Sequence, residues 1–256
     1  MTDTKKDGAI TDPFKVDTQT IIRSLASKDR AAVRDICCKT AFRNMGSDRV
    51  FEDREVHADY WTSYYTDHRS SESWVIERDG EIIGYFLGCS DHAHFVRVMA
   101  IRILPWCLIR VIWALATGRY RKPESRRYVR HMLFKGPREA PKIDYKAFPA
   151  HYHCNILRKG YGNGYYTQLT LMFLDVLEAK GIKALHGHIT EPSDSGIWQR
   201  FVDRFTSASA DVTDEVPTTL FRDVLGDVRP MVNRVWGISV PNYRAGILWL
   251  RETRNL

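Results

Sequence analysis

An α/β domain with a mixed sheet of about seven strands, flanked by helices, is the fold that the sequence predicts. Two apolar, β-rich runs within 73–90 enclose Asp79-Gly80, and Asp-Gly between such runs is a strong hairpin signal. Further along, a strand pattern at 148–157, a glycine-rich loop and a helix pattern at 165–181 follow one another. A chain that alternates strands and helices in this way is typical of a layered α/β domain.

The N-terminal part is predicted to hold a tail, one strand and two helices. Residues 1–16 are polar without periodicity, which indicates a disordered tail, so 17–256 form one domain. A strand is expected at 18–24. Apolar side chains at helical spacing predict a helix at 27–42, with its first serine as the N-cap, and a second helix is expected at 50–66.

A long apolar and basic stretch interrupts the domain between the third and fourth predicted strands. Residues 95–116 are long enough to cross a bilayer, which takes about 20 residues. Three arginines interrupt them, and each would cost about 2.5–3.5 kcal/mol at the centre of a membrane helix. Proline disfavours helical geometry just before itself, so we expect two short helices broken at Leu104-Pro105.

The basic run that follows makes 95–131 a helical insertion with two interpretations. In the first, which we favour, its apolar face packs on the domain as a lid over the acceptor side of the sheet, and its arginines reach solvent. In the second, it forms an amphipathic membrane-surface patch with a basic rim. After this insertion we expect a strand at 182–190, a helix from Ser193 or Asp194 onward, and a late strand at 216–224.

The net charge and the cysteine content limit the classes of binding partner and the cellular location that we expect. The formal net charge of +7 favours anionic partners, such as the phosphates of a cofactor or a lipid headgroup. Nucleic acid is not expected, because the basic residues are not interleaved with an aromatic platform. The five cysteines are odd in number and lack metal-ligand spacing, and the first residues lack an apolar run, so we expect no disulfides and a cytoplasmic location.

Glycines alternate in the loop between the predicted strand at 148–157 and the next helix. Gly160, Gly162 and Gly164 let backbone N–H groups turn toward the positive end of that helix. Such a nest binds phosphate oxygens and therefore suits a diphosphate-bearing cofactor. No Gly-Lys-Ser/Thr ends the loop, and it comes too late in the chain for a dinucleotide-binding fingerprint.

The region from about residue 21 to 205 resembles the GNAT acetyltransferases. It is closest to a bacterial branch similar to the acetyltransferase-like domain of O-GlcNAcase enzymes. The stretches that carry the resemblance are 21–41, 77–95 and the cofactor core 148–189, with its Pro-Ala-His-x-His element. The resemblance implies acetyl-CoA as the acyl donor, its diphosphate on the glycine loop, and the acyl group in a gap between the fourth and fifth strands.

The family loop, Gln/Arg-x-x-Gly-x-Gly/Ala, fits this chain in two registers. An ungapped comparison places Tyr161, Gly164 and Tyr166 at the three family positions, whereas a shift of two residues places Lys159, Gly162 and Gly164 there. In either register the expected cofactor-binding residues are Leu157, Lys159, Gly160, Tyr161, Gly162, Asn163, Gly164 and Tyr165.

The family's usual tyrosine acid and its Gly-Phe pair are replaced here by Arg200 and by Arg204-Phe205. The remaining candidates for a proton donor to the departing thiolate are Tyr165, Tyr166 and Asp194.

Histidines two residues apart lie on the two strands that would flank the thioester. Histidine suits a general base because its pKa is near neutral, and His153, His151 and His188 are our catalytic candidates. Backbone N–H groups at 155–157 would hold the carbonyl oxygen. Two other interpretations are structural histidines and a zinc site formed with His186; we expect no metal.

The function that these patterns favour is an enzyme that transfers an acetyl group from acetyl-CoA directly to a primary amine, on a small molecule or a protein. One alternative is a catalytically degenerate GNAT module that only binds acyl-CoA or a partner. The other is a membrane-surface acyltransferase that acts on an amino-lipid.

Overall fold

The computed structural model describes residues 20–195 and 212–253. The predicted tail, 1–16, and the residues Arg200, Arg204 and Phe205 lie outside this range. The elements, in chain order, are β1 (Thr20–Ser24), η1 (Ser27–Asp29), α1 (Arg30–Asn44), η2 (Ser47–Arg49), α2 (Arg54–Ser63), η3 (Tyr64–His68), β2 (Ser73–Arg78), β3 (Glu81–Cys89), α3 (His92–Val98), η4 (Met99–Ile103), α4 (Leu104–Ala116), α5 (Pro123–Phe134), β4 (His151–Ile156), η5 (Arg158–Gly160), α6 (Tyr165–Ala179), β5 (Ala184–Pro192), β6 (Val212–Thr218), α8 (Leu220–Leu225), β7 (Met231–Ser239) and α9 (Val240–Thr253).

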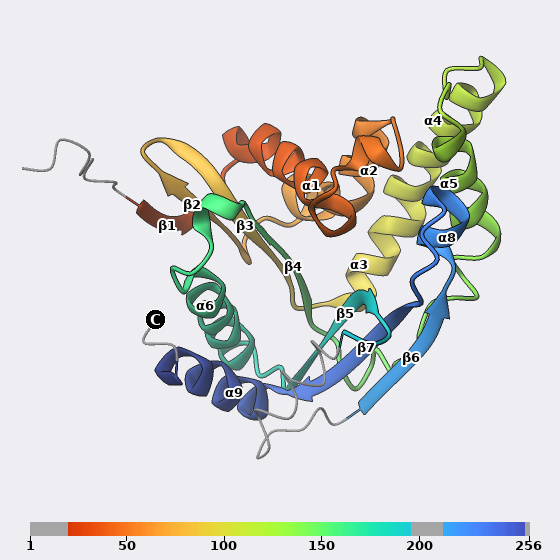
Figure 1. Ribbon diagram of the computed structural model, residues 1–256. Coiled ribbons are helices and arrows are strands. Elements are labelled where there is room, and N and C mark those ends of the chain that lie inside the picture. Colours follow the sequence, from red (N-terminus) through yellow and green to blue (C-terminus); the bar gives the residue numbers. More distant parts are fainter. Residues whose placement is uncertain (1–19, 196–211, 254–256) are drawn as a thin grey trace, which may run out of the picture.

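The strands form two sheets that meet at one point. Four strands lie in the order β1-β2-β3-β4 and three in the order β5-β7-β6. The two sheets are linked by a parallel bridge between Ala150 and Leu185, where the His186 N–H donates to the Ala150 carbonyl at 2.8 Å. Beyond this bridge β4 and β5 diverge, and Figure 1 shows the two strands running apart. The mixed α/β class with about seven strands, predicted from the sequence, is confirmed.

The central hairpin follows the predicted turn and packs closely on α6. Asp79 and Gly80 have φ of 51° and 79°, the left-handed conformation that a two-residue hairpin loop needs. Further along β3, a Cβ on Gly88 would lie 2.4 Å from the Glu72 carbonyl and 2.6 Å from the Phe173 ring. Glycine at this position therefore lets the four-stranded sheet approach the helix that begins at the glycine loop.

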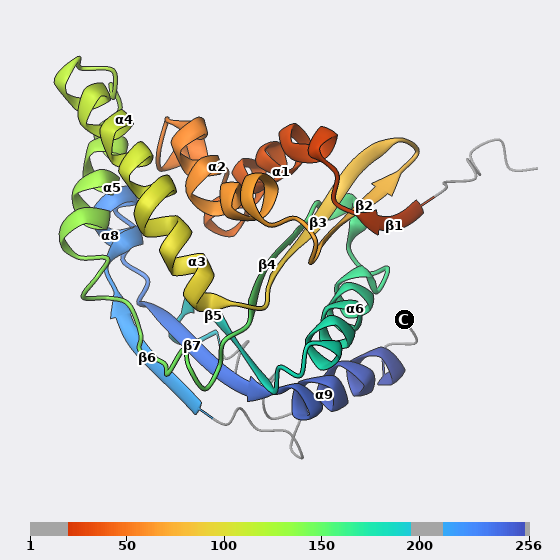
Figure 2. The ribbon, with the colours of Figure 1, turned by 180° about the vertical axis from the view of Figure 1, so that it is seen from behind.

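Helices cover the four-stranded sheet on both faces, and Figures 1 and 2 agree on their sides. Alternate side chains of a strand point to opposite faces. Tyr85 therefore packs in the core under α1 and α2, whereas Phe86 packs against Phe173 of α6. The second core continues into α9 through Tyr243 and Ile247. This layering places the edge strand β4 between two cores, with its far edge turned to the gap.

Several predicted boundaries were wrong at the ends of the chain's helices and strands. The predicted N-cap, Ser27, begins a separate 3₁₀ turn, and α1 starts after Asp29, which accepts a hydrogen bond from the Ala26 N–H. The late strand expected at 216–224 is the end of β6 followed by α8, because Thr218 and Thr219 are held by Glu139 where the chain turns.

The insertion contains one continuous helix, not two short ones. α3, η4 and α4 run without a break from His92 to Ala116, and the backbone at Leu104 is helical, with φ −61° and ψ −44°. Pro105 lies in the first turn of α4, and the preceding turn, Met99–Ile103, has the wider π-helical geometry. A π turn rearranges the hydrogen bonds around the missing proline N–H, which explains why the expected break is absent.

The favoured prediction that this helix packs its apolar face on the domain holds for one stripe of side chains and not for the rest. One stripe of its side chains is buried against the domain: Met99, Ile103, Cys107, Val111 and Ala114. Phe95 and Val98 are half-buried, but most of the other apolar side chains are exposed, and α4 projects beyond the body of the molecule (Figure 2). Its length and composition are those of a membrane-crossing helix, with 28% of the apolar window buried. The helix approaches β4 at its N-terminal end and elsewhere follows α2, which is not the course of a lid.

Candidate active site

The glycine loop turns the chain from the end of β4 into α6. Gly162 and Gly164 have φ of 81° and 71°, and Gly164 is the N-cap of α6. Residues with a Cβ rarely adopt this left-handed conformation, which explains why both positions are occupied by glycine. The backbone N–H groups in the first turn of α6 have no partner within the helix, so they can bind an anionic ligand beside the loop.

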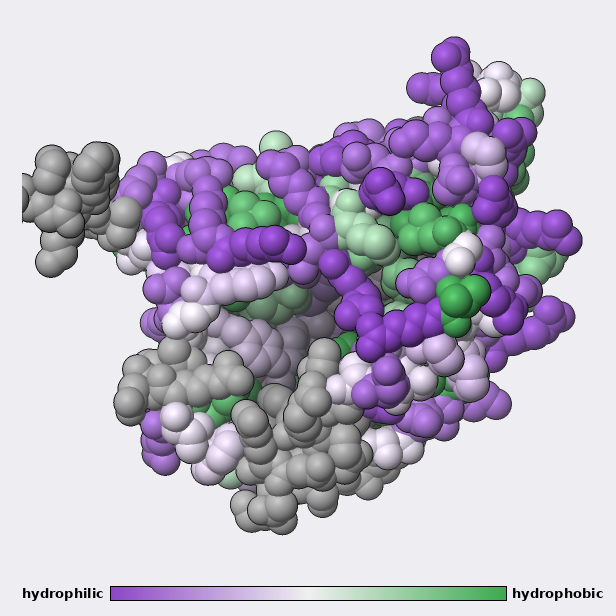
Figure 3. Space-filling model, in the orientation of Figure 1, coloured by the Kyte–Doolittle hydropathy of each residue, from purple (hydrophilic) through white to green (hydrophobic). Residues whose placement is uncertain are grey.

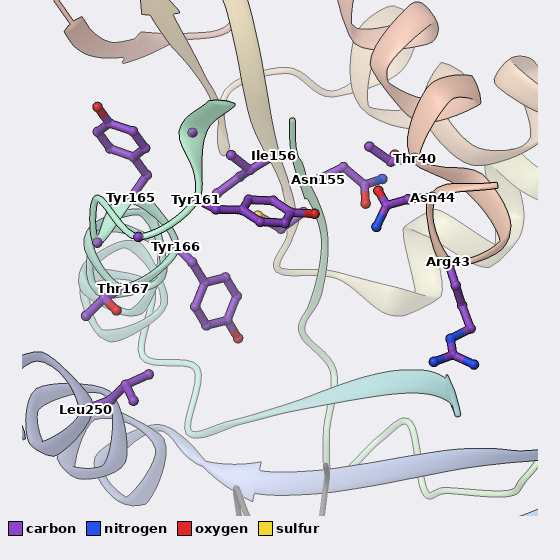
Figure 4. Close-up of a pocket in the computed structure, with 14 residues that line it drawn as sticks. Thr40, Arg43, Asn44, Asn155, Ile156, Tyr161, Tyr165, Tyr166, Thr167 and Leu250 are labelled. Carbon is purple, nitrogen blue, oxygen red and sulfur yellow. The ribbon is translucent and has the colours of Figure 1, made fainter. Parts of the chain in front are cut away.

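A pocket of about 640 Å³ lies beside this loop, and its wall is formed from α1, β4, the loop and the start of α6. Figure 3 shows it as a hollow beneath α1, and Figure 4 shows the side chains that face it. It is a size that holds a cofactor. The lining residues are Thr40, Arg43, Asn44, Cys154, Asn155, Ile156, Gly160, Tyr161, Gly162, Gly164, Tyr165, Tyr166, Thr167 and Leu250.

The edge of β4 that faces the gap offers backbone hydrogen-bond groups. The Leu157 N–H donates to the Ile83 carbonyl at 2.8 Å, so odd-numbered residues of β4 pair with β3. N–H directions alternate along a strand. Those of Cys154 and Ile156 therefore point into the gap, where no described strand pairs with them. The expected carbonyl-binding group at 157 is thus engaged elsewhere, and the available donors lie earlier on the strand.

The C-terminal end of α1 forms an unusual wall of the pocket. Phe42, Arg43 and Asn44 have φ of 51°, 60° and 66°, a left-handed run of three residues with side chains. Such conformations cost about 1–3 kcal/mol each and gather at binding sites. The turn brings the exposed Arg43 side chain into the cleft opposite the loop (Figure 4). Arg43 could not be predicted from the sequence, since nothing in a helical pattern marks a left-handed end.

Three tyrosine hydroxyls from three elements meet behind the pocket. Tyr152 of β4 lies 2.6 Å from Tyr166 of α6 and 2.5 Å from Tyr243 of α9, and Tyr166 lies 2.8 Å from Tyr243, all between hydroxyl oxygens. Tyr166 also lines the pocket. Burial raises its pKa, and hydrogen bonds from Tyr152 and Tyr243 act in the opposite direction. The cluster can supply a proton from Tyr166 and share the resulting charge among three hydroxyls.

The other two proton-donor candidates are less well placed. Tyr165 lines the pocket, but its hydroxyl accepts a hydrogen bond from Arg78 at 3.1 Å. Asp194 pairs with Arg229 at 2.9 Å and does not line the pocket. Of the three candidates, Tyr166 combines pocket access with two tyrosine hydroxyl neighbours.

His153 lies on the face of β4 that looks toward α2. Its ring is 5.5 Å from those of Trp61 and Tyr85, and its Nε2 lies 3.2 Å from the Asn155 amide nitrogen. Asn155 lines the pocket, so one side chain separates His153 from it. Burial lowers the pKa of His153 to about 4. Its Nδ1 is buried with no hydrogen-bond partner among the described residues.

His151 belongs to a separate cluster at the closed end of the gap. Its Nδ1 lies 3.5 Å from that of His92 at the start of α3, and its ring centre is 5.0 Å from that of His186. His92, which the sequence analysis missed, stacks on Tyr145 with ring centres 3.9 Å apart. His188 of β5 lies at the margin of this cluster, with its ring centre 5.6 Å from His186.

The ligand atoms of His92, His151 and His186 all lie within 4.8 Å of one another. Burial lowers the pKa of His92 to about 4 and of His186 to about 3, so these rings are neutral and their lone pairs are not protonated near pH 7. His186 Nδ1 lies 2.7 Å from the Phe148 carbonyl, which fixes the ring as metal-binding histidines often are. These three could hold a transition metal. The four-histidine zinc site that was weighed as an alternative does not form, because His153 lies apart.

Some of the predicted site residues line the pocket and others lie outside it. Five of the eight expected cofactor residues line the pocket: Gly160, Tyr161, Gly162, Gly164 and Tyr165. Leu157, Lys159 and Asn163 do not, and Lys159 is paired with Glu81 on the outside of the loop. None of His153, His151 and His188 lines the pocket itself.

No protein-family model matches this chain, and no curated protein sequence matches it either. Among solved structures, it is similar to SsHAT at 24% identity and a TM-score of 0.57, over 86% of this chain and 98% of that one. An N-acetyltransferase from Staphylococcus aureus Mu50 matches at 11% identity and a TM-score of 0.45, over 87% and 99%. An acetyltransferase of the GNAT family from Streptococcus pneumoniae matches at 12% and 0.43, over 86% and 99%. The chain therefore shares the fold of SsHAT.

Proposed function

We propose that this protein is an acetyl-CoA-dependent N-acetyltransferase that transfers the acetyl group directly to a primary amine. The observation that carries the proposal is the split between β4 and β5, with the glycine loop and the N-terminus of α6 at its open end. A split sheet leaves a strand edge free to bind an extended, amide-containing chain. The loop beside it suits the diphosphate of the same molecule.

In this proposal the pantetheine arm of acetyl-CoA lies along β4. Its amides pair with the backbone groups that face the gap, and the N–H groups of Cys154 and Ile156 are the donors available to it or to the thioester carbonyl. The diphosphate lies against the backbone of residues 160–165. Arg43, across the cleft, neutralises part of the phosphate charge.

Transfer then needs three events that the described residues can perform. The amine nitrogen attacks the thioester carbonyl carbon, and a backbone N–H of β4 stabilises the oxygen as it gains negative charge. The carbon–sulfur bond breaks and the electron pair leaves with the sulfur. Tyr166 gives its proton to the thiolate, while Tyr152 and Tyr243 hydrogen-bond to the phenolate that remains.

The proton lost by the amine goes to His153 in this scheme. Its pKa of about 4 keeps the ring neutral at physiological pH. Its Nε2 lies 3.2 Å from the amide nitrogen of Asn155, which lines the pocket, so a water beside Asn155 carries the proton from the amine to the ring. The amine then approaches from the α1–α2 side of β4, opposite the tyrosine cluster. His151 and His188 lie at the closed end of the gap and take no part in proton transfer in this scheme.

Turnover is the test of this function, because a degenerate module of the same fold would also bind acetyl-CoA. A panel of polyamines, amino sugars, amino-lipids and lysine peptides is incubated with labelled acetyl-CoA and the protein. Release of CoA with label on an amine supports the enzyme. Binding of acetyl-CoA with no acceptor-dependent release of CoA across the panel would favour the module.

A further inference from the structure

The exposed side of the α3–α4 helix is an apolar surface without a partner in the described part of the chain. Its largest exposures are Ile101 at 68%, Ile109 at 60%, Trp106 and Ile112 at 56%, and Trp113 at 54%. Leu133 and Phe134, at the end of α5, are exposed as well. Contiguous apolar surface of this extent is uncommon on soluble monomers and marks an interaction site.

Positive charge is concentrated in the same segment. Residues 92–138 carry eleven lysine and arginine side chains and one acidic side chain, Glu124. Subtracting these from the chain's 38 basic and 31 acidic side chains leaves 27 and 30. The whole positive excess of the protein therefore lies in and around the apolar helix, and the remainder of the chain is slightly acidic.

The basic side chains around the apolar surface are free to meet an anionic partner. Arg97, Arg102, Arg119 and Arg130 are exposed and have no ion-pair partner among residues 20–195 and 212–253. Arg119 lies over the Trp113 ring at 4.8 Å, so a cation and an interfacial aromatic residue occupy the same spot. Tryptophan and arginine together are typical of residues at the level of lipid headgroups.

We propose that the exposed face of α3 and α4, with the start and end of α5, docks on an anionic phospholipid bilayer. A second copy of the chain is disfavoured as the occupant, because it would bring two strongly basic segments together. An anionic membrane satisfies both observations at once, since acyl chains accept the apolar side chains and headgroups accept the arginines.

The helix docks in the plane of the interface and does not cross the membrane. Its buried stripe packs against the domain, and Arg110 fastens it to α2 through Asp59 at 3.3 Å and Asp53 at 3.8 Å. Crossing would require breaking these contacts. The helix spans 25 residues, or about 37 Å at 1.5 Å per residue. Its N-terminal residue, His92, contacts the histidine cluster beside β4, so docking would bring the candidate active site near the membrane.

Vesicle sedimentation of the full-length protein tests the docking without reference to acetyl transfer. Vesicles of phosphatidylcholine with about 30% phosphatidylglycerol should pellet the protein at low salt. Pure phosphatidylcholine should pellet at least about tenfold less, and raising the salt from about 0.1 M to 0.5 M should release the protein. No pelleting with the anionic vesicles would overturn the proposal.

Two pairs of variants assign the binding to this surface. Ile109→Glu with Trp113→Glu should weaken vesicle binding at least about tenfold, whereas Val228→Glu, at an isolated side chain that is 85% exposed, should not. Arg119→Glu with Arg130→Glu should do the same, and the control Lys146→Glu with Lys183→Glu makes an equal change of charge elsewhere. Equal binding by each variant and its control would overturn the assignment.

Two further outcomes identify other occupants. A wild-type dimer by light scattering that the Ile109 and Trp113 double variant converts to monomer, without vesicle binding, would show that a second copy covers the surface. Membrane binding that resists both high salt and alkaline extraction would show a spanning helix. Either result would contradict interfacial docking.

Discussion

The glycine loop with α6 and the long α3–α4 helix both begin beside β4, yet they differ in how far their apolar side chains are buried. α6 buries its apolar stripe in the core through Leu169, Phe173 and Leu177, all with no exposed surface. α3–α4 is more apolar and remains largely exposed. Hydrophobic periodicity shows that a face avoids water, but not whether the same chain covers it.

The largest effect should come from charge at the glycine loop. We expect Gly162→Asp to weaken acetyl-CoA binding at least about 100-fold, because a carboxylate would lie where the diphosphate meets backbone N–H groups. The matched control is Gly226→Asp, also at a left-handed glycine (φ 74°) with open space around it. Calorimetry of both variants measures the difference. Equal affinity in both would make the loop a turn and nothing more.

A smaller effect should separate chemistry from binding. Tyr166→Phe is expected to lower kcat for acetyl transfer about 10- to 100-fold, because the departing thiolate loses its proton donor. Affinity for acetyl-CoA should change little, since the ring stays in place. Tyr128→Phe, at a buried ring away from the pocket, is the control. Unchanged kcat in Tyr166→Phe would remove this residue from the mechanism.

The histidine cluster should make the fold sensitive to acid. Burial holds the pKa of His186 at about 3, below the ordinary 6.5, so the unfolded chain binds a proton that the folded one does not. Stability is therefore full above pH 6.5 and falls as pH drops toward 3. One such group costs about 1.4 kcal/mol at pH 5.5. His186→Gln should flatten part of the slope of melting temperature between pH 7 and 5; an unaltered slope would mean that His186 does not contribute.

Arg43 should have a modest role on the open side of the pocket. Because its side chain is exposed, solvent screens its attraction for phosphate, and Arg43→Ala should weaken acetyl-CoA binding about two- to fivefold. Arg49→Ala removes an exposed arginine just beyond the same helix and should leave affinity unchanged. If the two variants weaken binding equally, the effect is one of net charge and not of the left-handed turn.

Substitutions in the exposed helix should have the smallest effect on acetyl-CoA binding. Ile109→Glu with Trp113→Glu should leave affinity for free acetyl-CoA within about twofold of wild type in the absence of vesicles, because neither side chain lines the pocket. Calorimetry under the conditions used for Gly162→Asp gives the value. A large loss would mean that the helix and the loop act as one unit.

Local patterns predicted the elements whose signals are local. The Asp79-Gly80 turn, β2 and β3, and the glycine loop before α6 could be predicted because each rests on residues next to one another in the chain. The position of helical ends was less predictable, since Ser27 and Pro105 allow more than one geometry. Strand β7 (Met231–Ser239) was not predicted. It lies between β5 and β6 at the centre of the second sheet, a position that follows from tertiary pairing and not from a local pattern.

The candidate site was predicted where it is continuous in sequence and missed where distant elements meet. The loop residues lie close to one another in the chain, so glycine spacing revealed them. His92 reaches His151 from 59 residues away, and Tyr243 reaches Tyr152 from 91 residues away. Arg43 enters the cleft through a left-handed turn that has no glycine to mark it. These residues come together through packing, which a single sequence does not display.

Amide hydrogen exchange along β4, measured by NMR with and without acetyl-CoA, tests the central claim most directly. If the donor lies in the gap between β4 and β5, the amides of Cys154 and Ile156 should exchange at least about tenfold more slowly when it is bound. The Leu157 amide, already bonded to the Ile83 carbonyl at 2.8 Å, should change little. Binding that leaves the Cys154 and Ile156 amides unprotected, or no binding at all, would contradict the placement of acetyl-CoA in this cleft.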